Sequence, residues 1–144
     1  MSGDQLLAAL RGAGLLDENA SLRLARTAAD KGLPLEEVVA EEGSIDDGAI
    51  ADAKATVLRV PRYAVPDKIA PAVLQLVPQE TAQTYQVMPL SSADGNLVVG
   101  MVNPDDLRAQ EALKFLARQQ RLNLGVFLIS LGDWKKGLRA YSPF

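Results

Sequence analysis

Apolar residues recur at helical spacing through residues 1–58 and then change to short continuous runs. The first helical segment carries three leucines on one face: Leu6, Leu7 and Leu10. Asp17 and Asp46 each precede a longer apolar stripe, where an aspartate commonly accepts from the free N–H groups of a helix start. The last stripe is expected to face inward through Ile50, Ala53 and Val57. The pattern therefore predicts four helices before residue 60.

The two helix pairs look alike when the sequence is shifted by 29 residues. LLAALRGAGLLDENASLRLA then aligns with LEEVVAEEGSIDDGAIADAK, so that Gly14 falls on Gly43 and Asp17 on Asp46. Each unit reads as a short helix, a Gly-x-hydrophobic-Asp corner and a longer helix. One pair of this size cannot bury its own apolar face, so the repeat predicts that two pairs pack together.

Prolines separate this half from the rest, because Pro61, Pro66 and Pro71 forbid one continuous helix. The runs QVMPLSS and NLVVGMV follow, and the Asp-Gly between them predicts a hairpin. A third strand is expected from about Leu122 to Ile129. We therefore expect an α+β fold. Residues 1–60 would form a helical repeat subdomain, and residues 61–144 a small α+β subdomain with a sheet of at least three strands.

The polar corner NPDD joins the second strand to an amphipathic segment. Asn103 is expected to cap a helix whose first residue is Pro104, with two aspartates where the helix dipole favours negative charge. The buried stripe of that helix is expected to contain Leu107, Ala112, Leu113 and Leu116. Two aspartates at a helix start disfavour an anionic ligand, so the corner is interpreted as a structural joint.

Composition narrows the chemistry, because the 144 residues include no His and no Cys. The commonest general base, the commonest metal ligand and all thiol chemistry are therefore absent. We expect no catalytic residue, no cofactor and no metal site. The formal net charge of -3 gives no nucleic-acid footprint. The chain has neither a signal peptide nor an apolar run of transmembrane length, which predicts a cytoplasmic protein.

The segment LVVGMVNPDDLRAQEALKFL resembles a recurring segment in the N-terminal domains of type II secretion and type IV pilus assembly ATPases. RVPRYAVPDKIAPAVLQLVPQETAQTYQVMPL is similar to the part that precedes it in those domains, and the paired helices of residues 6–58 resemble their tandem repeats. The resemblance covers most of the chain. Of the two systems, type II secretion is preferred.

The resemblance implies a docking and regulatory domain. In that family the N-terminal domain recruits a hexameric ATPase to the inner membrane by binding the cytoplasmic part of a bitopic platform protein. The motor would follow Phe144, and no G-x-x-x-x-G-K-[ST] loop occurs in this chain, so we expect no enzyme activity here. The implied partners are the platform protein and the chain's own ATPase domain, with no nucleic acid and no direct membrane insertion.

Cyclic di-GMP binding is the alternative function. Some relatives bind this nucleotide through repeats that each open with a basic residue, Leu and Gly. Carried over to this chain, the two openings fall on Gln5, Leu6 and Leu7 and on Pro34, Leu35 and Glu36. The leucine is kept both times, whereas the cation and the glycine are lost both times. The resemblance therefore favours protein docking over nucleotide binding.

Seven residues are candidates for partner docking: Leu6, Leu7, Leu10, Arg23, Arg26, Glu37 and Glu41. The leucines would present an apolar helix face near a free terminus, which is a common recognition mode. The acidic residues would favour a basic partner surface. Three alternatives stand beside these roles. The leucines would pack on the second helix, the acidic face would be solvated, and the arginines would pair with it internally.

Overall fold

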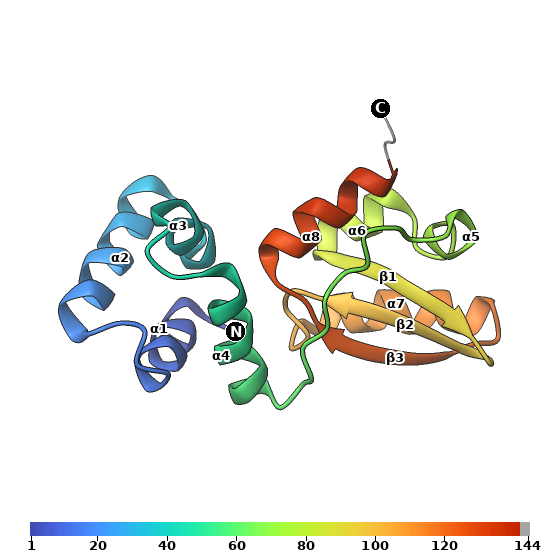
Figure 1. Cartoon of the computed structure of the whole chain (residues 1–144), viewed down its shortest axis with the longest axis horizontal. Helices are drawn as coiled ribbons and strands as arrows, with labels where there is room; N and C mark the ends of the chain where they lie inside the picture. Colours follow the sequence, from blue (N-terminus) through green and yellow to red (C-terminus); the bar gives the residue numbers. More distant parts are fainter. Residues whose placement is uncertain (142–144) are drawn as a thin grey trace. The chain divides into compact units, whose positions relative to one another are not determined.

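The computed structural model describes residues 1–141 and divides the chain into two compact units, Met1–Val57 and Leu58–Phe144 (Figure 1). Within the described residues there are eight α-helices and one three-stranded sheet. The helices of the first unit precede every strand, and helices pack on the sheet in the second unit. The predicted α+β fold is therefore confirmed.

The first unit consists of α1 (Gly3–Gly12), α2 (Glu18–Lys31), α3 (Leu35–Glu42) and α4 (Asp47–Leu58). Asp17 caps α2 by accepting from the Ala20 N–H at 2.7 Å, and Asp46 accepts from the Ala49 N–H at 3.3 Å before α4. Gly14 and Gly43, at φ of 75° and 73°, make the corner in each helix pair. This left-handed backbone favours glycine, so the two pairs turn by the same local chemistry.

The core of the first unit is almost entirely aliphatic. Its buried members are Leu6, Leu7, Leu10, Leu24, Leu35, Val38, Val39, Ile45, Ile50 and Ala53. The prediction that Val57 faces the core was wrong. This side chain is 53% exposed, because it lies beyond the last buried turn of α4.

The second unit contains α5 (Pro71–Leu74), α6 (Gln79–Tyr85), β1 (Val87–Ala93), β2 (Asn96–Met101), α7 (Leu107–Gln119), β3 (Asn123–Leu128) and α8 (Leu131–Leu138), followed by a 3-10 turn, η1 (Arg139–Tyr141). The strand order is β1-β2-β3, with β1 antiparallel and β3 parallel to β2. The expected hairpin and third strand are both present. Asp94 and Gly95 have φ of 54° and 78°, as a two-residue hairpin turn of type I′ requires.

Helices cover both faces of the sheet (Figure 1). The neighbouring side chains of Val87 and Met88 in β1 point to opposite faces, and both are buried. Val87 packs with residues of α6 and α7 on one face, whereas Met88 packs with Trp134 of α8 on the other. Gly100 allows the close packing of β2. A Cβ added at this residue would lie 2.4 Å from Cγ2 of Ile129, so only glycine fits without a shift.

The structure corrects the start of α7. The helix begins at Leu107 and its cap is Asp106, whose carboxylate accepts from the N–H groups of Arg108 and Ala109. Asn103, the predicted cap, instead donates to the Gln86 side chain at 3.1 Å. Pro104 therefore lies in a turn before the helix rather than at its first position.

The predicted buried stripe of α7 was wrong for Leu107, which is 72% exposed, and Ala112 and Leu116 are only half-buried. The buried residues of this helix are Ala109, Leu113 and Ala117. They follow one another at intervals of four, so they form a single stripe that faces the sheet. Within the NPDD corner, Asp106 thus serves the helix start, whereas Asn103 and Pro104 do not have their predicted roles.

Candidate docking site

The three candidate leucines lie inside the first unit. Leu6, Leu7 and Leu10 are 5%, 6% and 0% exposed, and all three belong to its aliphatic core. Ser2 and Gln5 cap α1 reciprocally, each side chain bonding the backbone N–H of the other residue. Exposing three such side chains would cost roughly 5–9 kcal/mol at the usual 1.5–3 kcal/mol each. The first helix is therefore docked in the free chain.

A groove of about 560 Å³ runs along the outside of α1, between that helix and α4. Its walls are mostly small side chains and apolar surface. The lining residues are Gln5, Ala8, Ala9, Gly12, Ala13, Ala53, Thr56 and Val57. The outer side of α1 thus remains accessible while its leucines are buried.

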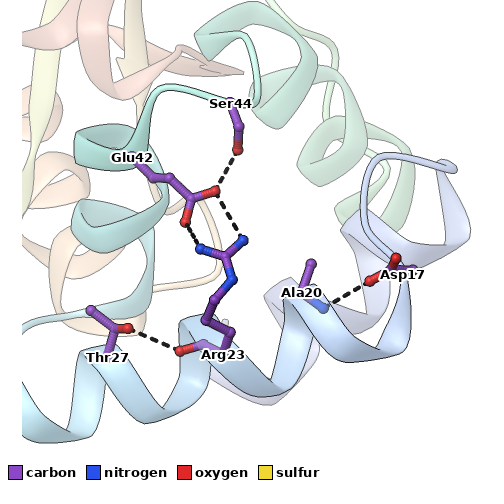
Figure 2. A network of polar contacts seen from close by, with 6 residues as sticks. All are labelled: Asp17, Ala20, Arg23, Thr27, Glu42 and Ser44. Carbon is purple, nitrogen blue, oxygen red and sulfur yellow. Dashed lines mark hydrogen bonds and ion pairs between the residues drawn. The ribbon is translucent and has the colours of Figure 1, made fainter.

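Arg23 forms a two-point ion pair with Glu42 (Figure 2). It projects from α2 and donates through Nη1 to Glu42 at 2.7 Å and through Nη2 at 3.4 Å, where α3 ends. Ser44 donates to the same carboxylate. The hydrogen bonds from Ser44 and then Arg23 hold the pKa of Glu42 below its ordinary value. Internal pairing, the alternative to partner docking for this arginine, is what the structure contains.

The other charged candidates are distributed around the same two helices. Glu41 on α3 lies 3.7 Å from Lys31 on α2, with both side chains more than half exposed. Glu37 is half-buried, and Arg26 is exposed. Exposed pairs of this kind contribute little to stability, so Glu41 stays available to a cationic partner at low cost.

A buried ion pair was missed by the sequence analysis. The Lys54 side chain on α4 is only 2% exposed, and its ammonium donates to Glu36 on α3 at 3.0 and 3.2 Å. Glu36 is itself 15% exposed, although the acidic run was expected to be a solvated face. A signal existed, because Lys54 lies four residues after the buried Ile50 in the apolar stripe of α4.

None of the residues that form the two repeat openings is basic. Gln5 is engaged in the cap of α1, and Pro34 precedes α3. Leu35 is buried, and Glu36 accepts from Lys54. Neither opening thus contributes a basic side chain of its own, and Lys54, which pairs with Glu36 at the second opening, is 2% exposed.

None of the helices within residues 1–141 has the length and apolar character needed to cross a membrane. Nor do three or more carboxylates in this part of the chain come together as possible metal ligands.

Comparison with known proteins places these features in a family context. Residues 64–144 match the family model of the MshEN domain. Over 78 residues the chain is 33% identical to the type IV pilus assembly ATPase PilB of Myxococcus xanthus (strain DK1622). That match covers 50% of this chain but only 14% of the pilus ATPase, so the chain corresponds to a small part of that protein's length.

Solved structures share the fold over nearly the whole chain. The N-terminal domain of XpsE superposes with a TM-score of 0.71 at 18% identity, covering 97% of this chain and 96% of that one. MshE with cyclic di-GMP (cdg) superposes with a TM-score of 0.68 at 18% identity, covering 94% and 97%. At this identity the likeness shows the fold alone.

Proposed function

The chain belongs to the MshEN domain family, and we propose that it is the N-terminal docking and regulatory domain of a bacterial type II secretion ATPase. The observation that carries this proposal is the family match, supported by the shared fold with the N-terminal domain of XpsE over 97% of the chain. The domain would bind the cytoplasmic part of a bitopic platform protein and so hold the motor at the inner membrane. ATP hydrolysis would belong to a hexameric motor domain outside these residues.

The first unit is the proposed docking surface. The groove beside α1 and the charged residues Arg26, Glu37 and Glu41 are accessible in the docked state, whereas Leu6, Leu7 and Leu10 become accessible only if α1 leaves the core. Binding of a partner to the leucines must offset the roughly 5–9 kcal/mol of free energy that exposing them costs. Binding would then couple partner recognition to a conformational change, which is how a regulatory domain passes a signal.

A reversible crosslink can test the opening of α1. A Cβ placed at Gly3 would lie 3.5 Å from Cβ of Leu35, which is within disulfide geometry, and the natural chain has no cysteine. We would therefore introduce Gly3→Cys with Leu35→Cys and measure binding of the platform protein's cytoplasmic part by calorimetry, reduced and oxidised. Binding is expected in the reduced form and lost in the oxidised form.

The single variant Leu35→Cys under both conditions is the control for lost packing at this core residue. Equal affinity of the crosslinked chain before and after reduction would mean that α1 stays docked. The leucines would then be excluded as contacts, and only the groove and the charged residues would remain. If the natural chain does not bind the platform protein at all, the docking proposal itself is wrong.

Cyclic di-GMP regulation is the second candidate, favoured by the shared fold with MshE in its complex with that nucleotide. The side chains at the two repeat openings count against it, because Gln5 is neutral and Glu36 is an acid. A ligand that binds only the folded state raises the melting temperature in a concentration-dependent way. Thermal melts followed by far-UV circular dichroism, with and without the nucleotide, should therefore show no shift if docking is the function.

A further inference from the structure

The outer edge of β3 is open over part of its length. In the parallel ladder, Asn123 donates to Gly95 and Ile129 to Met101, so the backbone groups of alternate residues face β2. Those of Leu124, Val126 and Leu128 therefore point to the opposite edge. Leu128 is satisfied there, because it donates to the Pro61 carbonyl and accepts from the Tyr63 N–H, both at 2.8 Å. Within residues 1–141, no corresponding partner reaches Leu124 or Val126.

Within the described part of the chain, Leu124 and Val126 stay unpaired because the segment that covers Leu128 does not continue along β3. If it continued along β3 in the same register, residue 61 would have to donate to the Val126 carbonyl, but a proline has no N–H. Arg59, two residues earlier, has a φ of 57°, a left-handed conformation that turns the chain away from an extended path. The covering segment thus ends at Pro61 and leaves two residues of edge unpaired.

The open edge forms one wall of a groove of about 430 Å³. Leu124 and Val126 of β3 lie on one side, and Gln110 and Lys114 of α7 on another. Val60, Pro61 and Pro104 add apolar surface beside them, and Arg59 completes the lining. A groove that offers unpaired strand groups and apolar side walls matches the way an extended peptide adds to a sheet.

The positive charge of the groove favours an acidic ligand. Its charged residues are Arg59 and Lys114, and no acid lines it. A neighbouring hollow along the same edge adds Arg118, with Glu111 as its one acid. Two copies of this chain paired edge to edge would bring these cations together, which disfavours self-association. We propose that β3 binds an extended segment of another protein, in which acidic residues alternate with aliphatic ones, as an added strand.

Nuclear magnetic resonance on the full 144-residue chain can test this proposal with a defined probe. The probe is a pool of octapeptides in which Asp or Glu alternates with Val, Ile or Leu, and the matched pool carries Lys or Arg in place of the acids. In the free chain the amides of Leu124 and Val126 should exchange rapidly with solvent. The acidic pool is expected to shift both amides and to slow their exchange, whereas the bonded amide of Leu128 serves as an internal reference.

Three variants sharpen the result. Val126→Pro removes an outward donor but no ladder bond, so it should abolish binding while the sheet persists. The pair Arg59→Gly with Lys114→Gln should weaken binding about fivefold at low salt and have less effect at high salt, because it removes both cations of the groove. Arg59→Gly also suits the positive φ. Lys68→Gln, an exposed cation outside the groove, is the control and should leave affinity unchanged.

Two results would overturn the proposal. The first is that neither amide responds to the acidic pool at millimolar concentration, or that both pools bind alike. Pro61 and the cations would then serve only to guard an exposed edge against aggregation. The second is sedimentation evidence that the chain dimerises through this edge, which would make a second copy its occupant.

Discussion

The two units of the chain satisfy their buried polar groups in different ways. The first unit encloses a charged pair, with Lys54 at 2% exposure donating to Glu36. In the second unit the donors are neutral: the buried Trp134 donates to the Ala82 carbonyl at 3.1 Å, and the half-buried Tyr141 donates to the Val77 carbonyl at 2.8 Å. A buried charge is costly when its partner is lost, whereas a neutral donor costs much less. The helical unit should therefore be the more sensitive of the two to single polar substitutions.

Sequence similarity divides the chain in nearly the same place. The MshEN family model matches residues 64–144, which lie in the second unit, whereas the fold likeness to XpsE covers 97% of the chain. The first unit thus lies outside the residues that the family model matches but inside the region of shared fold.

The largest effect is expected from Glu36→Gln. Both carboxylate oxygens of Glu36 accept from the buried ammonium of Lys54, and the substitution removes this negative charge. The free energy of unfolding is expected to fall by about 3–5 kcal/mol. Urea unfolding can separate the two units, because Trp134 is the only tryptophan and no aromatic residue precedes Tyr63. The circular dichroism transition should move to lower urea while the Trp134 fluorescence transition stays in place.

The matched control for this substitution is Asp30→Asn, an exposed carboxylate on α2. It should change the free energy of unfolding by less than about 0.5 kcal/mol, as surface substitutions usually do. An equally small effect of Glu36→Gln would show that the buried pair contributes no more than a surface one.

A pair of glycine substitutions should act in opposite directions. Gly100→Ala in β2 places a Cβ 2.4 Å from Ile129, which is fully buried and cannot move aside, so a loss of about 1–3 kcal/mol is expected. Gly12→Ala in α1 meets nothing within 4 Å and should stabilise the helix by about 0.4–1 kcal/mol. Fluorescence should report the first change, and circular dichroism the second. Two effects of the same sign would contradict the packing described for these residues.

Tyr141→Phe should alter alkaline unfolding. Burial raises the pKa of Tyr141 from 10.0 to about 12. The neutral phenol therefore makes its full contribution to the free energy of unfolding below pH 10, and this contribution is lost as the pH rises toward 12. The phenylalanine variant loses the bond to Val77, at a cost of about 1 kcal/mol near neutrality. Its free energy of unfolding should then fall less steeply than that of the natural chain between pH 10 and 12. Parallel pH profiles would refute this assignment.

The smallest effect is expected from Glu42→Gln. Hydrogen bonds from Ser44 and Arg23 lower the pKa of Glu42 from 4.5, so its contribution is present above that value and is lost as the pH falls through the lowered pKa. The glutamine variant should lose stability slightly at neutral pH and converge with the natural chain in acid. Arg23 is 60% exposed, so added salt should shrink the difference at neutral pH. A difference that persists in acid would mean that the substitution disturbs packing instead.

Local patterns predicted most elements of the fold but not the pairings between distant residues. Asp94-Gly95 fixed the hairpin because a two-residue turn has few sequence solutions, and Asp17 identified the start of α2 for a similar reason. The start of α7 was misplaced because Asn103 and Asp106 can both cap, and Asn103 instead bonds to Gln86, which is distant in sequence. The partner of Lys54 and the open edge of β3 also depend on tertiary contacts.

The candidate docking residues illustrate the same limit. Their helical spacing correctly indicated one face for Leu6, Leu7 and Leu10, but periodicity alone could not decide between a buried face and a recognition face. Whether the seven residues contact a partner stays a prediction. The pairing of Arg23 with Glu42 reduces the charge that this arginine offers to a partner.

The docking function is tested most directly by a calorimetric titration of the 144-residue chain with the cytoplasmic part of the platform protein, repeated with cyclic di-GMP. We predict saturable binding of the protein and no heat from the nucleotide. Saturable binding of the nucleotide, with none of the platform protein, would contradict the docking function and identify the chain as a nucleotide-responsive regulator.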